Sequence, residues 1–212
     1  AGVVQVVDFI SELRQCADLS QLTVGRNVVV IDGGMAATDA ALKAKKLGAR
    51  EVTLVYRRGE AAMKASPAER LWAVQCGVVI RHWSEPVAFE SQNNQVTGVT
   101  FRVMHQGEKG IEATGEQFTL AADMVLEAIG QALDPHPLGG LHVKNGRIAT
   151  DAQGRTSLPG VWAGGDCCAG GLDLTVDAVR QGKIAARSIA LALTISQADA
   201  ANSMLSQERS HG

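Results

Sequence analysis

Runs of β-branched residues alternate with helix-forming residues near the start of the chain. Asn27–Ile31 is a β-branched run between turn residues, which is typical of a buried parallel strand. Met35–Leu47 carries apolar residues at helical spacing among Ala and Lys, and Val52–Tyr56 is a second buried run. This order predicts a βαβ half-unit in which the N-terminus of the helix faces the turn after the first strand.

The remainder of the chain continues this mixed pattern. We expect helices over 3–16, 67–76 and 174–193, strands over 78–83, 123–129 and 161–163, an antiparallel meander over 86–90, 96–105 and 117–120, and a hairpin of 141–144 with 147–150. Ser66 before Pro67 signals a helix start, and Asn145-Gly146 signals the hairpin turn. The polar residues after Ser196 predict a frayed tail. Together these elements predict an α/β fold.

The turn after the first strand carries an imperfect dinucleotide fingerprint. The pattern G-x-G-x-x-G/A would span 32–37, where Gly34 and Ala37 stand in place but Asp32 replaces the first glycine. Aspartate tolerates a left-handed backbone, so the tight turn survives, whereas its carboxylate is unfavourable beside a pyrophosphate. The flanking strands and helix favour a nucleotide site over the alternative of an ordinary strand-to-helix turn.

Two arginines follow the second strand, where an NAD site would carry an acidic residue. Arg57 and Arg58 suit a ribose 2′-phosphate, which guanidinium groups bind through charge-assisted bidentate hydrogen bonds. Lys64 is a candidate third cation. The pattern favours NADP(H), although the nearby Glu60 leaves NAD(H) open. The alternative to a nucleotide site is a basic loop that only contacts solvent.

Two more turns lie where α/β sheets bind ligands. Gly130 follows the buried strand that ends at Ile129. Gly165 and Asp166 precede a long helix that begins near Leu174, so its positive end faces the same loop. An aspartate that accepts from a ribityl hydroxyl would suit a flavin, and the alternative is a plain turn that Asp166 caps.

Composition excludes several functions. The 212 residues suffice for one large or two small domains, and the formal charge of -2 gives no reason to expect nucleic acid or an acidic membrane as a partner. No apolar run is long enough to span a bilayer. The four cysteines form no C-x-x-C motif and no metal-ligand spacing, so we interpret Cys167-Cys168 as small packing residues rather than a redox pair. Free cysteines fit a reducing cytoplasm.

Four motifs carry a family resemblance. They are Val-Val-Ile-x-Gly-Gly-x-x-Ala at 29–37, Val-Tyr-Arg-Arg-Gly at 55–59, Ala-Ile-Gly-Gln at 128–131 and Gly-Val-Trp-Ala-Gly-Gly-Asp at 160–166. In this order they resemble the flavin-dependent pyridine nucleotide oxidoreductases of the glutamate synthase small-subunit and dihydropyrimidine dehydrogenase flavoprotein type. The resemblance implies a Rossmann-like three-layer fold with a parallel sheet and an antiparallel meander, followed by the C-terminal part of a second, FAD-type domain.

The resemblance also implies a domain plan and a set of site residues. It assigns 1–23 to a linker helix of the FAD domain, 24–129 to an NAD(P)H-binding domain, 130–197 to the C-terminal segment of the FAD domain, and 198–212 to a flexible tail. The implied cofactor-binding residues are Gly33, Gly34, Met35, Ala36 and Ala37 at the pyrophosphate, Arg57, Arg58 and Lys64 at the adenosine phosphate, Ala128, Ile129 and Gly130 near the nicotinamide, and Gly165, Asp166, Leu174, Thr175 and Val176 at FAD. It implies no catalytic side chain and no metal ligand.

The implied activity is hydride transfer from NAD(P)H to FAD, with electrons passing on to an iron–sulfur or flavin partner subunit or domain. Association of two copies of this chain as a homodimer is also possible. Asp32 and Met35 depart from the family pattern, which has glycine and Asn or Asp there, and a second glycine fingerprint for FAD does not occur among these residues. We therefore expect an excised part of a longer protein that is inactive alone. The alternatives are an isolated nucleotide-binding module and a docking module without turnover.

Overall fold

The computed structural model describes residues 1–130, 132–134 and 139–209, with side chains as far as Ile195. Gln131 of the third motif and residues 210–212 of the expected tail lie outside the described residues. The chain divides into two compact units, Ala1–Gly130 and Gln131–Gly212, and each is described by itself.

A five-stranded parallel sheet forms the centre of the first unit. Its strands lie in the order β1 (Val3–Gln5), β8 (Met124–Glu127), β2 (Asn27–Ile31), β3 (Glu51–Val55) and β4 (Val78–Arg81). Four residues of β2 and three of β3 are buried, because both faces of the sheet are covered. The buried strands that the β-branched runs predict are therefore confirmed.

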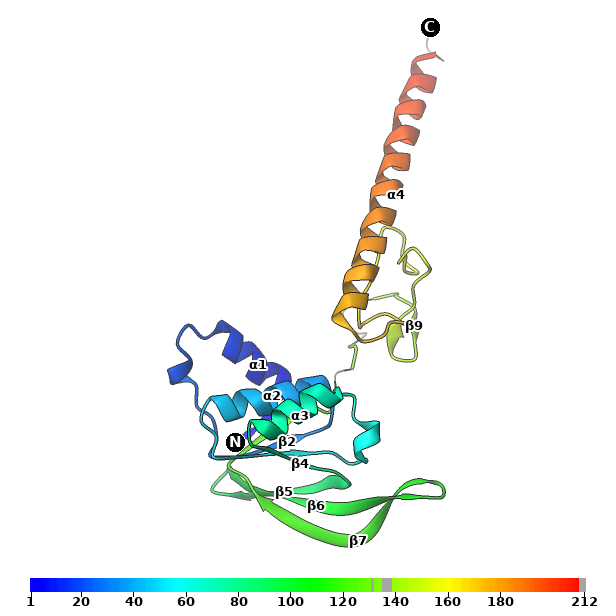
Figure 1. Cartoon of the computed structure of the whole chain (residues 1–212). Helices are drawn as coiled ribbons and strands as arrows, with labels where there is room; N and C mark the ends of the chain where they lie inside the picture. The colour runs from blue at the N-terminus through cyan, green and yellow to red at the C-terminus, as the bar shows by residue number, and fades with distance from the viewer. Residues whose placement is uncertain (131, 135–138, 210–212) are drawn as a thin grey trace. The chain divides into compact units, whose positions relative to one another are not determined.

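Helices cover one face of this sheet. They are α1 (Val6–Gln15), α2 (Met35–Lys46) and α3 (Pro67–Gln75), and all three lie on the same side of the strands (Figure 1). Val28, Val30 and Leu54 pack against the alanines at positions 37, 40, 41 and 44 of α2. Small alanine side chains let the helix backbone approach the sheet closely, which positions the start of α2 at the end of β2.

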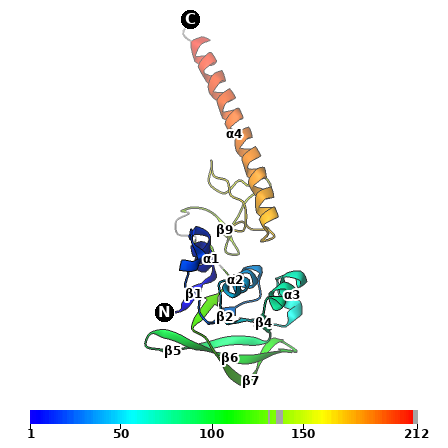
Figure 2. The same cartoon turned by 60° about the vertical axis from the view of Figure 1, so that its left-hand side comes forward.

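An antiparallel meander covers the other face. It consists of β5 (Ser84–Gln92), β6 (Gln95–Gly107) and β7 (Gly110–Ala121), which lie below the parallel sheet in both views (Figures 1 and 2). Val29 and Ile31, which alternate with the helix-facing valines of β2, pack here against Val99 and Phe101. The three layers confirm the predicted Rossmann-like fold class with a meander.

The N-terminal segment differs from its prediction. Val3–Gln5 is strand β1, paired in parallel with β8, and only Val6–Gln15 is helical. The helical spacing of apolar residues continues through a strand this short, so local periodicity cannot separate the two. Val6 and Phe9 are buried in the core of the first unit, whereas the family resemblance assigns residues 1–23 to the FAD domain.

The second unit is built on a long helix. It contains α4 (Thr175–Arg209) and a hairpin of β9 (Val143–Lys144) with β10 (Arg147–Ile148). The first unit also contains two short 3₁₀ turns, which span Leu19–Gln21 and Glu60–Ala62. The helix begins as predicted, but it continues through 198–209, where a flexible tail was expected, because that segment is rich in alanine and other good helix formers. Trp162 forms only an isolated bridge with Arg155 in place of the predicted strand.

None of the described helices combines the length and hydrophobicity that a membrane-crossing segment needs.

Candidate functional site

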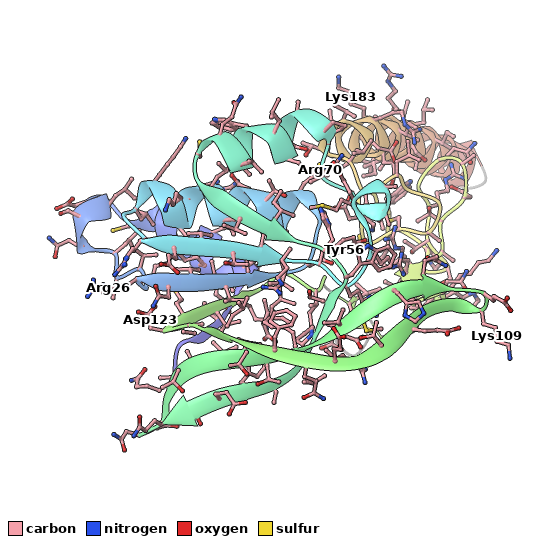
Figure 3. All side chains as sticks on the ribbon, turned by 60° about the horizontal axis from the view of Figure 1, so that its bottom comes forward. Arg26, Tyr56, Arg70, Lys109, Asp123 and Lys183 are labelled. Carbon is pink, nitrogen blue, oxygen red and sulfur yellow. The ribbon has the colours of Figure 1, made fainter. Side chains whose placement is uncertain are left out.

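The turns that the sequence singles out in the first unit meet at one edge of the parallel sheet. Ile31 pairs with Val55 in register, the Asp32 amide donates to the Val55 carbonyl at 3.0 Å, and the Ala128 amide donates to the Ile31 carbonyl at 3.0 Å. Tyr56 lies at this carboxyl end of the strands, while Arg26 and Asp123 lie at the opposite end (Figure 3). The glycine turn, the arginine pair and Ala128–Gly130 therefore all begin at the edge where open α/β sheets bind ligands.

Asp32 forms the first corner of the glycine turn. Its φ of 119° lies in a region that glycine usually fills, so the tight turn does survive the substitution at the cost of backbone strain. Its Oδ2 accepts from the Gly34 amide at 3.1 Å. Gly34 is the residue before α2, so the carboxylate lies at the positive end of that helix.

Gly33 is fixed by its surroundings. A Cβ added there would lie 2.8 Å from the ring of Tyr56, and the Gly33 carbonyl accepts from the Ala65 amide at 3.2 Å. The Tyr56 hydroxyl in turn donates to the Ala62 carbonyl at 2.8 Å. These contacts tie the loop that carries Lys64 to the glycine turn. In the sequence Tyr56 stands at the end of a buried run and within the motif at 55–59, but nothing there indicates its contact with Gly33.

The start of α2 offers backbone amides rather than side chains. Met35 and Ala36 are exposed, whereas Ala37 is fully buried and packs into the core. The amides of these first-turn residues have no acceptor within the helix, and together they form the positive end that binds phosphate oxygens. Ala37 thus occupies the position that the fingerprint reserves for close helix–strand packing.

The arginine pair after β3 remains largely free to bind an added anion, because the nearest acid, Glu85, is already paired. Arg57 and Arg58 are exposed at the end of β3. Glu85 lies 3.9 Å from Arg57, but its carboxylate is bound by Arg102 at 2.5 and 2.6 Å. Because Arg102 already neutralises Glu85, Arg57 keeps most of its capacity for another anion.

Glu60, the residue that left the nucleotide preference open, has its own partner. Its Oε1 lies 3.3 Å from Arg70, and Arg70 also donates to the Ala65 carbonyl at 2.8 Å. The carboxylate is therefore directed toward α3.

The segment after β8 is the third one that begins at this edge of the sheet. Ile129 is 68% exposed there, and Gly130 has a φ of 97°.

In the second unit a chain of hydrogen bonds holds the Gly164–Gly165 loop against α4. The Gly165 amide donates to Gln181 Oε1 at 2.9 Å, and Gln181 Nε2 donates to Asp177 Oδ2 at 2.8 Å. Asp177 also accepts from the Leu172 amide at 3.1 Å and from Arg180 Nε at 2.8 Å. The Leu172 amide, followed by Arg180, lowers the pKa of the Asp177 carboxyl below its usual value.

Sequence patterns missed Asp177 and Gln181. Their only signal is a spacing of four on the first two turns of a helix, which places both on one face. Of the residues that the family resemblance assigns to FAD, Asp166, Leu174, Thr175 and Val176 are exposed around the same helix start, and Gly165 is half-buried. The Asp166 carboxylate can accept hydrogen bonds from a ligand, and the exposed amides at the start of α4 can donate them.

The vicinal cysteines have unequal environments. Their Sγ atoms lie 3.9 Å apart, and Cys168 is buried beside Ile148 while Cys167 is half-buried. Burial raises the pKa of the Cys168 thiol to about 12, with a smaller contribution from Cys167. Cys168 therefore stays protonated and serves packing. Within the described part of the chain, no group of three or more His, Cys, Asp or Glu residues could hold a metal ion.

Comparison with known proteins identifies the family of this chain. The family model of the pyridine nucleotide-disulphide oxidoreductases matches residues 1–182. The chain is 37% identical to the NADP(+)-dependent formate dehydrogenase subunit beta of Moorella thermoacetica, over 89% of this chain and 28% of that protein. It is 32% identical to the glutamate synthase (NADPH) small chain of Escherichia coli K12, over 78% of this chain and 38% of that protein. It thus spans well under half of the length of these relatives.

Solved structures share the fold. The thioredoxin reductase of T. acidophilum superposes with a TM-score of 0.69 at 24% identity, covering 80% of this chain and 53% of that one. At this identity the likeness supports the fold and not a shared substrate.

Proposed function

Because the chain belongs to the pyridine nucleotide-disulphide oxidoreductase family, we propose that it binds NADP(H) and acts as part of a flavoprotein that passes a hydride from NAD(P)H to FAD. A pyridine nucleotide and FAD, the cofactors expected from the sequence, are those of this family. One observation carries the proposal: the register of Ile31 with Val55 brings the glycine turn and the arginine pair to the same edge of the sheet.

The nucleotide would extend along this edge. The amides of Met35 and Ala36 would bind the pyrophosphate at the positive end of α2, beside Gly33 and Gly34. Arg57 and Arg58, with Lys64 on the loop tied to Gly33, would bind the adenosine 2′-phosphate. Exposed Ile129 and Gly130 at the end of β8 would lie nearest the nicotinamide.

NADP(H) is favoured over NAD(H) by the partners of the two neighbouring acids. Glu85 is bound by Arg102, and Glu60 is directed to Arg70, so neither is committed to a ribose 2′-hydroxyl. Both arginines are exposed where a 2′-phosphate would lie. The names of two relatives, which specify NADP(+) and NADPH, agree with this preference.

The second unit would supply one side of a flavin site. We assign residues 24–129 to the nicotinamide domain and 130–197 to the C-terminal segment of an FAD domain. Gly165 lets the backbone approach a ligand, Asp166 would accept from a ribityl hydroxyl, and the start of α4 at Leu174–Val176 would face the flavin ring. FAD supplies the hydride-accepting ring, and this chain binds and orients the reactants without a side-chain acid or base.

Electrons would then leave through a partner. Relatives of this chain are named as a subunit of formate dehydrogenase and a small chain of glutamate synthase, which supports a partner subunit as the recipient. An iron–sulfur or flavin centre on that partner, or on a further domain, would accept the electrons. Glutamate synthase and dihydropyrimidine dehydrogenase types are the two acceptor systems that the sequence motifs favour.

A second candidate function is docking without turnover. Around and along α4 the second unit exposes large apolar side chains, including Leu172 at 70%, Val176 at 75% and Leu191 at 64%. Such exposure is typical of a surface that packs against another polypeptide segment. A docking module would keep this surface and bind no nucleotide.

Calorimetry with NADPH and NADH separates these functions. The proposed function predicts saturable binding of NADPH by the 212-residue chain, tighter than binding of NADH. If neither nucleotide binds, only the docking function survives.

A further inference from the structure

The Asp32 carboxylate lies at the start of α2, where the proposed site would hold the pyrophosphate. Its Oδ2 accepts from the Gly34 amide, and a Cβ added to Gly34 would lie 3.2 Å from that same oxygen. A negative charge is thus already held against the positive end of α2. A bound dinucleotide would bring further negative charge to the first-turn amides next to it.

The turn cannot relieve this conflict by moving its backbone. The Asp32 amide is bonded to Val55, and Asp32 is held at a φ of 119°. Gly33 cannot shift inward because Tyr56 fills the space behind it, and its carbonyl is bonded to the Ala65 amide. Only rotation of the half-buried Asp32 side chain could move the charge, and rotation would break its bond to Gly34.

The arginine pair lies away from this conflict. Arg57 and Arg58 follow β3, whereas Asp32 follows β2, and the 2′-phosphate and the pyrophosphate are separate groups of one ligand. A carboxylate beside the pyrophosphate weakens that group's contribution and leaves the contribution of the 2′-phosphate in place.

We propose that Asp32 is an affinity-lowering residue of the nucleotide site: it opposes the pyrophosphate, so that nucleotide affinity depends on the 2′-phosphate bound by Arg57 and Arg58. This inference rests on the proposed nucleotide site and adds a residue whose charge acts against binding. It explains how an acid can stand at a fingerprint position without abolishing the site. NADH carries the same pyrophosphate and meets the same opposition, but it has no 2′-phosphate to offset it.

The test is an Asp32→Asn substitution in the full chain. Asparagine can accept from Gly34 and tolerates positive φ, so the turn is kept and only the charge is removed. The probes are NADPH, which carries both phosphate groups, and adenosine 2′-monophosphate, which lacks the pyrophosphate. Thermal unfolding verifies that the variant is folded.

Asp32→Asn is expected to bind NADPH about ten-fold more tightly at low salt, with the gain shrinking as salt rises. Its affinity for adenosine 2′-monophosphate should equal that of the wild type. Asp39→Asn is the matched control, because Asp39 lies one turn along α2 and pairs with Lys43. It removes one negative charge from α2 itself without entering the glycine turn.

Three results overturn the inference while the wild type still binds NADPH: no gain in Asp32→Asn, an equal gain for adenosine 2′-monophosphate, or an equal gain in Asp39→Asn. Binding of NADPH by Asp32→Asn but not by the wild type would show that the carboxylate closes the site, and it would overturn the proposed binding of NADPH by the natural chain. If no protein binds any probe, the proposed nucleotide site itself is wrong and the inference falls with it. The two failures are therefore distinguishable.

Discussion

Gln181 links Asp177 to Gly165: its amide nitrogen donates to the Asp177 carboxylate at 2.8 Å while its amide oxygen accepts from the Gly165 backbone at 2.9 Å. Asp177 is only 6% exposed, although it stands on the first turn of a surface helix. The pair fixes the loop of the proposed flavin site to α4. A site of this kind needs such support, because loops alone position ligand groups less well than helices.

Asp177→Asn is expected to lower the midpoint of thermal unfolding by about 2–4 °C at neutral pH, because the bonds from Leu172 and Arg180 lose their charged acceptor. The folded-state pKa of Asp177 is depressed, so its contribution is present above the unfolded pKa and is lost as pH falls through the folded value. The difference between wild type and variant should therefore shrink below about pH 4. Circular dichroism melts between neutral and acid pH measure this. A difference that stays constant into strong acid would contradict the assignment.

Gly33→Ala is expected to destabilise the chain by about 1–3 kcal/mol, because the new Cβ would lie 2.8 Å from the Tyr56 ring. Gly182→Ala is the control, since a Cβ there meets nothing within 4 Å. As an exposed helical position it should gain about 0.5–1 kcal/mol. Denaturant unfolding measures both changes. Equal stability of Gly33→Ala and wild type would show that Tyr56 does not confine the turn.

Cys168 is expected to resist alkylation while Cys167 reacts. Burial raises the Cys168 pKa to about 12, so almost no thiolate forms at pH 8. Iodoacetamide labelling of the native chain followed by peptide mass spectrometry measures the two rates, with denatured protein as the control for full reactivity. Labelling of Cys168 as fast as half-buried Cys16 would contradict its packing role.

Several elements of both units could be predicted from the sequence because their signals are local. Asn27–Ile31 is β-branched throughout and forms β2 with those bounds. Ser66 and Glu69 form the capping box that starts α3, with bonds of 3.3 and 2.7 Å. The turn residues Asn145 and Gly146 both adopt positive φ in the hairpin. In each case the residues that decide the structure are neighbours in the chain.

Other features depend on partners distant in sequence and could not be predicted. Strand β1 exists because Val3–Gln5 pairs with 125–127, and nothing within those three residues distinguishes strand from helix. The contact of Tyr56 with Gly33 and the bond from Gln181 to Gly165 likewise need the folded chain. Glu60 leaves the nucleotide preference open in the sequence, and its pairing with Arg70 is visible only in the folded chain.

The arginine pair is proposed to bind the 2′-phosphate of NADP(H), and the double variant Arg57→Gln with Arg58→Gln removes both guanidinium groups. Arg50→Gln is the matched control, because Arg50 precedes β3 at the opposite end of that strand and is exposed. Removing two charge-assisted contacts should weaken NADPH binding about 100-fold and leave NADH binding unchanged. Calorimetric titration of the three proteins with both nucleotides gives the ratio of affinities. If the ratio of NADPH affinity to NADH affinity is the same in the double variant and the wild type, the arginine pair does not bind the 2′-phosphate.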